Sequence, residues 1–226
     1  MAVAMLTDAD HDRVSAAVSA AEAHSAGEIV TILTDRSDGY WDVALAWAAL
    51  VAATAILMLS LTPAFYLGLI DRVTGAWANE WTAGEIFAVA LGGAAVKFLG
   101  MLVLQLWQPL KFFLVPPPVK ARRVRARAVT CFKVGAERRT HGRTGILIYL
   151  SMREHRAEIV ADAAIASKVA PEVWGEAMAA MLIEIKAGRI AEGMVAAIER
   201  VGAVLAEHFP RAGDDVNKLP DRLIEV

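Results

Sequence analysis

Residues 43–70 read VALAWAALVAATAILMLSLTPAFYLGLI and contain no charged side chain. A helix needs about 20 consecutive apolar residues to cross the hydrocarbon core of a bilayer, so this run is long enough even with some tilt. Pro63, near its end, can kink or terminate the helix. A second apolar run occupies residues 86–115 and reads IFAVALGGAAVKFLGMLVLQLWQPLKFFLV. Together the two runs predict a two-helix transmembrane hairpin over residues 43–115.

Lys97 interrupts the second run. An ionisable group near the centre of a bilayer costs about 2.5–3.5 kcal/mol on insertion scales, but the apolar residues around Lys97 outweigh that cost. The ammonium group can snorkel or face the first span, and Gly92, Gly93 and Gly100 permit close helix packing. The alternative is that Lys97 lines an ion or proton path in a small transporter, which two spans could form only in an oligomer.

A cluster of basic residues follows the second run directly. The stretch VPPPVKARRVRARAV, residues 115–129, ends the span with three prolines and then contains Lys120, Arg122, Arg123, Arg125 and Arg127. Positive residues close to a span end favour the cytoplasmic side, whereas the segment between the spans has a net negative charge. Because a hairpin returns the chain to its starting side, we expect a multi-pass protein of the inner (cytoplasmic) membrane with both termini in the cytoplasm.

The basic cluster is expected to contact the lipid bilayer. Anionic lipid head groups suit a polybasic segment next to a span, and other membrane proteins are further candidate partners. Nucleic acid is disfavoured because the formal net charge of the chain is -2 and no aromatic residue interleaves with the basic ones. The single cysteine, Cys131, excludes an internal disulfide and lacks the spacing of a zinc site. The N-terminus has no basic start, so a signal peptide is not expected.

The two flanks of the hairpin predict one shared domain. Residues 1–42 contain a helix, for which Thr7 is the candidate N-cap, and one apolar strand, EIVTILTD. One helix and one strand are too little to fold alone. They therefore need partners from beyond the hairpin, in residues 116–209.

The second flank supplies those partners. A basic helix is expected over about 118–139, with Val124, Ala128, Cys131 and Phe132 as its apolar stripe. Strands at 144–152 and 157–161, joined by a polar turn, should pair antiparallel. Helices are expected at about 163–169, 171–187 and 189–208, and residues 210–226 are expected to form a loose tail. This pattern predicts an α/β fold, a small three-layer α/β/α sandwich with the transmembrane helical hairpin inserted into it.

The segment HGRTGILIYLSMREHRAEIVADAAI resembles the TPM domain family, which includes thylakoid proteins of photosystem repair and many bacterial membrane proteins. Further similarity lies in GEIVTILTD and in AGRIAEGMVAAIERVGAVLAEHFP, so the resemblance covers roughly 8–35 and 128–210. It implies an α/β/α sandwich, an acidic cleft that holds a divalent cation such as Ca²⁺ or Mg²⁺, and the acid phosphatase activity of some plant members. Where the family has a Gly-x-Gly-Leu turn, this chain has ADAAI, with Asp162 replacing a glycine.

Antiparallel pairing of the strands at 145–151 and 157–161 would bring Asp162 close to His141, Arg143 and Thr144. A carboxylate, an imidazole, a guanidinium and a hydroxyl at one sheet edge could form a phosphoester site, with Asp162 as the metal ligand. The structural alternative is that Asp162 caps the following helix and Arg143 forms an ordinary surface ion pair. Asp35 and Glu154 should lie at the opposite strand ends.

Two functions remain open from the sequence. The first is a membrane-anchored, noncatalytic binding or assembly module for membrane proteins. The second is a metal-assisted phosphatase-like hydrolase that uses Asp162, Arg143 and His141. The motifs of P-loop enzymes, zincins and α/β-hydrolases are absent from the sequence.

Overall fold

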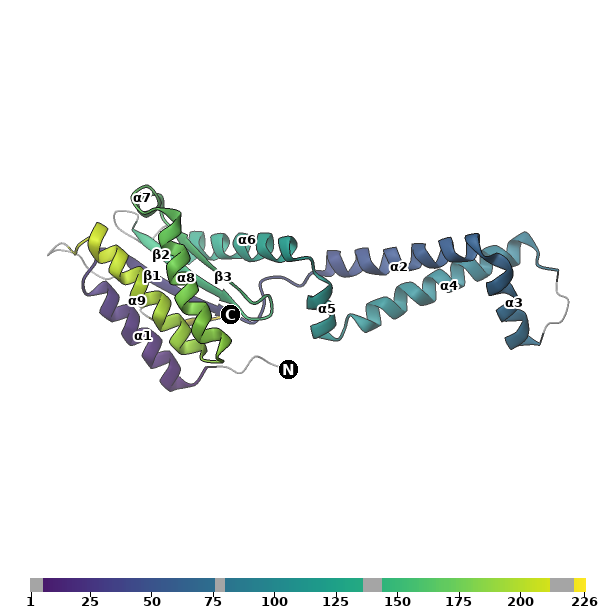
Figure 1. Ribbon diagram of the computed structural model, residues 1–226, viewed down its shortest axis with the longest axis horizontal. Helices are drawn as coiled ribbons and strands as arrows, with labels where there is room; N and C mark the ends of the chain where they lie inside the picture. The colour runs from purple at the N-terminus through teal and green to yellow at the C-terminus, as the bar shows by residue number, and fades with distance from the viewer. Residues whose placement is uncertain (1–5, 76–79, 136–143, 212–221) are drawn as a thin grey trace. The chain divides into compact units, whose positions relative to one another are not determined.

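The computed structural model describes residues 6–75, 80–135, 144–211 and 222–226. It divides into two compact units, Met1–Asp38 with Pro117–Val226, and Gly39–Pro116. The first unit is the α/β domain and the second is the helical hairpin (Figure 1).

The two flanks of the hairpin build one sheet. Its strands are β1 (Glu28–Thr34), β2 (Gly145–Ser151), β3 (Arg156–Ala161) and β4 (Ile224–Glu225), in the order β3-β2-β1-β4. β1 lies parallel to β2 and to β4, whereas β3 is antiparallel to β2. The apolar strand of the N-terminal flank therefore pairs directly with a strand from beyond the hairpin.

One face of the sheet is covered by α1 (Asp8–Glu22), α7 (Ala163–Ala166), α8 (Pro171–Lys186) and α9 (Ile190–His208). Their buried side chains pack on Ile29, Ile146 and Ile148. Helices α1 and α9 approach closely at Gly202. A Cβ added there would lie only 2.6 Å from the Cβ of Ala21. Apolar side chains that recur at helical spacing therefore form the larger part of the core.

The other face is covered by α6 (Pro117–Gly135). Val124 and Ala128 are fully buried and Phe132 is 5% exposed, and these side chains pack on Leu147 and Tyr149. The predicted stripe of the basic helix is thus confirmed, and so is the three-layer α/β/α arrangement. The apolar positions repeat at four-residue spacing, which places them on one side of the helix.

The start of α1 follows the predicted cap. The Thr7 hydroxyl accepts a hydrogen bond from the backbone N–H of Asp10, and the Asp10 carboxylate accepts one from the backbone N–H of Thr7. The hydrogen bonds from Thr7 lower the pKa of Asp10 below its ordinary value. This reciprocal arrangement satisfies N–H groups that the first helical turn leaves without intrahelical partners.

The structure differs from the predicted loose tail at residues 222–226. Leu223 is 4% exposed and belongs to the core, and β4 adds a short parallel edge strand to β1. The Val226 carbonyl also accepts a hydrogen bond from the Thr34 hydroxyl at 2.8 Å. The segment is too short to show a period of its own, so its pairing depends on the exposed edge that β1 offers.

The hairpin unit has two long helices, α2 (Trp41–Leu61) and α4 (Ala83–Leu104). With 21 and 22 residues, both are long and apolar enough to cross a membrane. The first apolar run divides at Pro63, which begins the separate helix α3 (Pro63–Thr74). Proline lacks the N–H that would continue α2, and it suits the first turn of a new helix. The second run ends earlier than its apolar composition indicates, because a turn separates α4 from α5 (Gln108–Leu114).

The entry and exit of the hairpin lie side by side. The rings of Tyr40 and Phe112 meet edge to face with centroids 5.6 Å apart, and the ammonium of Lys111 lies 4.2 Å from the ring centroid of Trp41. The indole N–H of Trp47 donates to the Leu114 carbonyl at 3.0 Å. The hairpin therefore begins and ends at one place, as a pair of spans must if both flanks are to share a sheet.

Candidate functional site

The predicted site lies where β3 ends beside the beginning of β2. The antiparallel pairing that this prediction needed is confirmed, with Ala161 opposite Ile146. Asp162 follows β3 directly and begins α7, whose first hydrogen bond runs from the Ala166 N–H to the Asp162 carbonyl at 2.9 Å. His141 and Arg143 lie outside the described residues, so their distance from Asp162 stays a prediction.

The Asp162 carboxylate is engaged with the backbone of the sheet. Its Oδ2 accepts a hydrogen bond from the Gly145 N–H at 3.0 Å, and the Asp162 N–H donates to the Gly145 carbonyl at 2.9 Å. The side chain is 6% exposed. Asp162 occupies the N-cap position of α7 without a side-chain capping bond, so its oxygen continues the β2–β3 ladder instead.

Thr144, the fourth member of the predicted cluster, also bonds to the backbone. Its hydroxyl donates to the Ala26 carbonyl at 2.8 Å, and its carbonyl accepts from the Glu28 N–H at 3.2 Å. Thr144 thus fastens the start of β2 to the segment that precedes β1. At this edge, the described residues present a carboxylate and a hydroxyl that each complete main-chain hydrogen bonding.

The arrangement can be tested against the divalent cation that the family resemblance implies. Ca²⁺ binds six to eight oxygen ligands, and Mg²⁺ requires near-octahedral geometry. No group of three or more His, Cys, Asp or Glu side chains in the described part of the chain is placed to hold a metal ion. The described residues around Asp162 therefore do not fit a protein-based cage for either cation.

A second polar cluster occupies the opposite end of the sheet, where β1 and β2 end. Glu154 is 4% exposed, and its carboxylate accepts hydrogen bonds from the Ser37 N–H at 2.9 Å and from the Ser151 hydroxyl. The Ser37 hydroxyl lies 3.0 Å from the hydroxyls of both Tyr149 and Ser151. Beside this network, the guanidinium of Arg153 donates to the Asp35 carboxylate at 2.8 Å.

The sequence placed Asp35 and Glu154 at this end, and the structure has them there. It did not predict Ser37, Tyr149 or Ser151 as their neighbours, although the two-residue spacing of Tyr149 and Ser151 places both on one face of β2. Burial raises the pKa of the Tyr149 phenol, and the hydrogen bond with Ser37 opposes part of that rise. The hydrogen bonds of this network fasten the segment after β1 to the end of β2.

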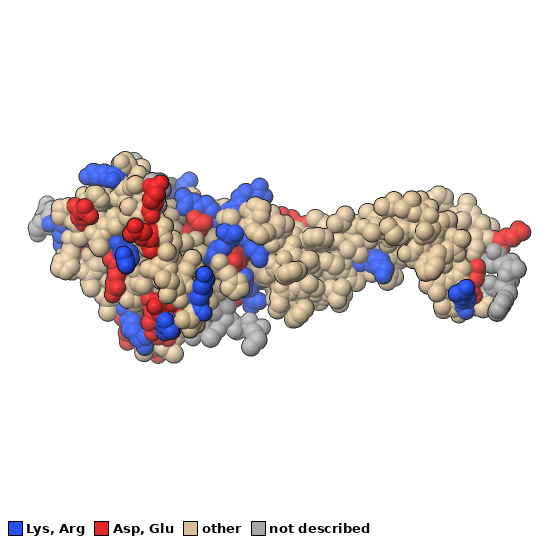
Figure 2. All heavy atoms as spheres, in the orientation of Figure 1, with Lys and Arg blue, Asp and Glu red and all other residues tan. Residues whose placement is uncertain are grey.

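The five basic residues at the start of α6 have different surroundings. Arg123 pairs with Asp38 at 3.0 Å, and Arg125 pairs with Glu158 at 3.2 Å. Arg122 and Arg127 are exposed and have no ion pair with another described residue. Charged side chains are frequent on the visible surface of the α/β domain, whereas they are sparse on the hairpin unit (Figure 2).

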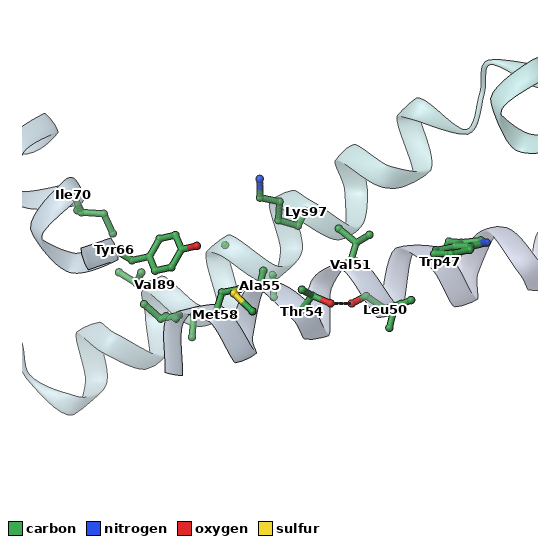
Figure 3. Close-up of a pocket in the computed structure, with 14 residues that line it drawn as sticks. Trp47, Leu50, Val51, Thr54, Ala55, Met58, Tyr66, Ile70, Val89 and Lys97 are labelled. Atoms are coloured by element: carbon green, nitrogen blue, oxygen red, sulfur yellow. Dashed lines mark hydrogen bonds between the residues drawn. The ribbon is translucent and has the colours of Figure 1, made fainter. Parts of the chain in front are cut away.

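The hairpin contains a groove with a cavity volume of about 660 Å³. It lies between α2, α3 and α4 and is lined mainly by apolar side chains (Figure 3). Lys97 of α4 and Tyr66 of α3 bring polar atoms to it. The sequence identified Lys97 as unusual, but it did not predict the groove, because the groove depends on α3 turning back at Pro63.

Comparisons with known proteins agree with this architecture. A comparison with curated proteins found no match. A solved structure, the NMR structure of the BA42 protein from the psychrophilic bacterium Bizionia argentinensis, is similar with a TM-score of 0.57 and 18% sequence identity over 100% of this chain and 99% of that one. At this identity the likeness concerns the fold alone. The family model of the TPM domain matches residues 120–204, which contain β2, β3, α7 and α8 and most of α6 and α9. The chain therefore contains a TPM domain.

Proposed function

We propose that this chain is a membrane-anchored TPM domain on the cytoplasmic face, where it acts as a noncatalytic binding or assembly module for membrane proteins. The observation that supports this most strongly is the state of Asp162. Its carboxylate is buried and accepts a main-chain hydrogen bond inside the sheet. One oxygen of this carboxylate therefore holds the start of β2, which favours a structural role for Asp162.

The apolar surface of the hairpin supports the anchoring. Phe87 and Leu91 on α4 are 74% and 73% exposed, and Leu61 on α2 is 65% exposed. Contiguous apolar surface of this kind is unfavourable in water and favourable in lipid. Away from their ends, helices satisfy their main-chain groups internally, as a bilayer requires.

The orientation follows from the basic residues after the hairpin. Their positive charge favours the cytoplasmic side, and the side-by-side entry and exit of the hairpin require both flanks to share that side. Arg122 and Arg127 are exposed and, unlike Arg123 and Arg125, form no ion pair with another described residue. They are the residues that we expect to contact anionic lipid head groups, at about 1 kcal/mol each near the membrane surface.

Cysteine labelling in inner-membrane vesicles tests the topology. In a Cys131→Ser background, Val134→Cys reports on α6, where Val134 is 77% exposed, and Glu80→Cys reports on the segment between α3 and α4. A membrane-impermeant maleimide should label position 134 only from the cytoplasmic side and position 80 only from the other side. Labelling of both positions from one side would refute the two-span topology.

Phosphoester hydrolysis tests the noncatalytic role. The full chain in lipid nanodiscs should not hydrolyse p-nitrophenyl phosphate above the protein-free rate, with or without millimolar Mg²⁺ or Ca²⁺. The informative variant is Asp162→Asn, because its amide oxygen can still accept the Gly145 hydrogen bond. Turnover that the Asp162→Asn variant loses would establish the phosphatase and reject the binding module.

The contribution of the basic cluster is tested with matched variants. The double variant Arg122→Gln/Arg127→Gln removes two arginines that pair with no other described residue, whereas Arg123→Gln/Arg125→Gln removes two that pair with Asp38 and Glu158. In nanodiscs of mixed anionic and zwitterionic lipid, native mass spectrometry should detect fewer retained anionic lipids for the first double variant than for the second. Equal retention by the wild-type chain and Arg122→Gln/Arg127→Gln would contradict the expected head-group contact.

A further inference from the structure

We propose that the groove between α2, α3 and α4 binds a transmembrane helix of another protein, and that this helix contains an Asp or Glu whose carboxylate pairs with Lys97. This inference rests on the proposed function, because it requires that the hairpin spans a membrane. It adds the chemistry by which a membrane partner would be recognised.

The first step is the shape of the groove. Its volume is about 660 Å³, and its lining side chains come from α2, α3 and α4, with Tyr66 extending from α3 (Figure 3). Gly93 lies in the lining, and a Cβ added there would meet nothing within 4 Å. The backbone of α4 is therefore accessible at this point, and small residues of this kind let a second helix approach closely.

The second step is the position of Lys97. It lies seven residues before the end of α4 at Leu104, a distance of about 10 Å along the helix axis. Side chains on a helix lean toward its N-terminus, so the lysine leans away from this nearer end of the helix. Snorkelling to the closer membrane surface is therefore hindered, and a counter-charge within the bilayer is the better means of stabilising the ammonium group.

The third step is that none of the acidic side chains described in the hairpin pairs with Lys97. Lys97 has no ion pair with another described residue. The acidic residues of the two spans, Asp42 and Glu85, both lie in first helical turns, and Glu85 caps its own helix through Thr82. Glu85 is twelve residues before Lys97, or about 18 Å along α4, which is too far for an ion pair.

These positions also decide between possible occupants. A second copy of this chain, inserted in the same orientation, would bring another Lys97 to the same depth and no carboxylate. Its charge would repel rather than pair. The apolar surface also continues beyond the groove, since Leu99 and Val103 on α4 are 59% and 63% exposed. A long apolar helix with one acidic residue matches both the length of this surface and its charge.

The test uses a model transmembrane peptide built from Leu and Ala, with one Glu placed at the depth of Lys97, and a twin peptide with Gln. The full chain is labelled at Glu80→Cys in the Cys131→Ser background, and association with each peptide in bilayers is measured by energy transfer. Interhelical polar contacts in model peptides correspond to about a fivefold to thirtyfold gain in association. The wild-type chain should associate with the Glu peptide more strongly than with the Gln peptide by this factor. For Lys97→Met, the difference in association between the two peptides should be less than about twofold.

A charge exchange completes the design. Lys97→Glu should bind a Lys-bearing peptide and lose the Glu peptide. Equal association of the Glu and Gln peptides with the wild-type chain would overturn the proposal. Two other results would also overturn it: self-association of the chain that requires Lys97, or retention of a fatty acid that requires Lys97. If cysteine labelling shows two spans and the peptides do not discriminate, the inference fails while the anchoring stands. If labelling shows that the chain does not span the bilayer, both fail.

Discussion

Asp162→Ala is the substitution that best separates a structural carboxylate from a catalytic one. It removes the oxygen that accepts the Gly145 N–H at 3.0 Å, and both residues are buried. Alanine offers no replacement acceptor, so a buried N–H at the start of β2 loses its partner. The same substitution in an active site would reduce turnover with little effect on stability.

The magnitude follows from the unsatisfied group. A buried donor without a partner costs about 1–3 kcal/mol. A domain of 150 to 250 residues loses about 2–4 °C of Tm for each kcal/mol, so the expected fall in Tm is about 2–12 °C. Asp162→Asn keeps an acceptor oxygen and should cost about 1 kcal/mol or less.

Two measurements on the full chain in nanodiscs check this expectation. Thermal unfolding followed by circular dichroism reports the loss of stability, and hydrogen exchange by mass spectrometry localises it to the peptide that contains Gly145. Faster exchange in that peptide is expected for Asp162→Ala but not for Asp162→Asn. Wild-type melting and wild-type exchange in Asp162→Ala would refute the structural role of this carboxylate.

Four further substitutions test the packing and electrostatics of the domain. Gly202→Ala should destabilise it by about 1–3 kcal/mol, because the new Cβ would lie 2.6 Å from that of Ala21. Gly175→Ala on α8, where an added Cβ meets nothing within 4 Å, should stabilise it by about 0.5–1 kcal/mol. Thermal melts in which both variants shift Tm in the same direction would contradict this packing. Because burial raises the pKa of Tyr149, its contribution to folding should be complete below the unfolded pKa near 10 and should be lost as pH rises through the higher folded value. Urea unfolding at alkaline pH measures this, and Tyr149→Phe should flatten that part of the pH profile. Leu223→Ala should cost about 2–5 kcal/mol in urea unfolding, and no change would show that the C-terminal segment lies outside the core.

The sequence predicted those parts of the fold that depend on local periodicity. The uncharged run at 43–70 indicated a membrane span, and the spacing of Val124, Ala128 and Phe132 predicted the buried side of α6. Even the sharing of one sheet by two distant segments could be inferred, because neither segment could bury its apolar residues alone. These features follow from the residue types and their spacing along the chain.

The remaining features depend on contacts that the local pattern does not record. The pairing of β4 with β1 requires an edge that exists only after the sheet has formed. The sequence identified Asp162 as a carboxylate at a strand end, but not that its oxygen would bond to Gly145, seventeen residues earlier. The Ser37 network likewise joins residues more than one hundred positions apart.

The pairing of β1 with β2 has a consequence for how this protein is made. β1 leaves the ribosome long before its neighbour, since at about 5–20 residues per second the intervening hairpin delays β2 by several seconds or more. During that interval the N-terminal strand has open edges on both sides, which makes it prone to mispairing. Under the proposed two-span topology, insertion of the hairpin ends this interval, because it returns the newly made β2 to the side of the membrane where β1 lies. Folding of the α/β domain would then be coupled to membrane insertion of the hairpin.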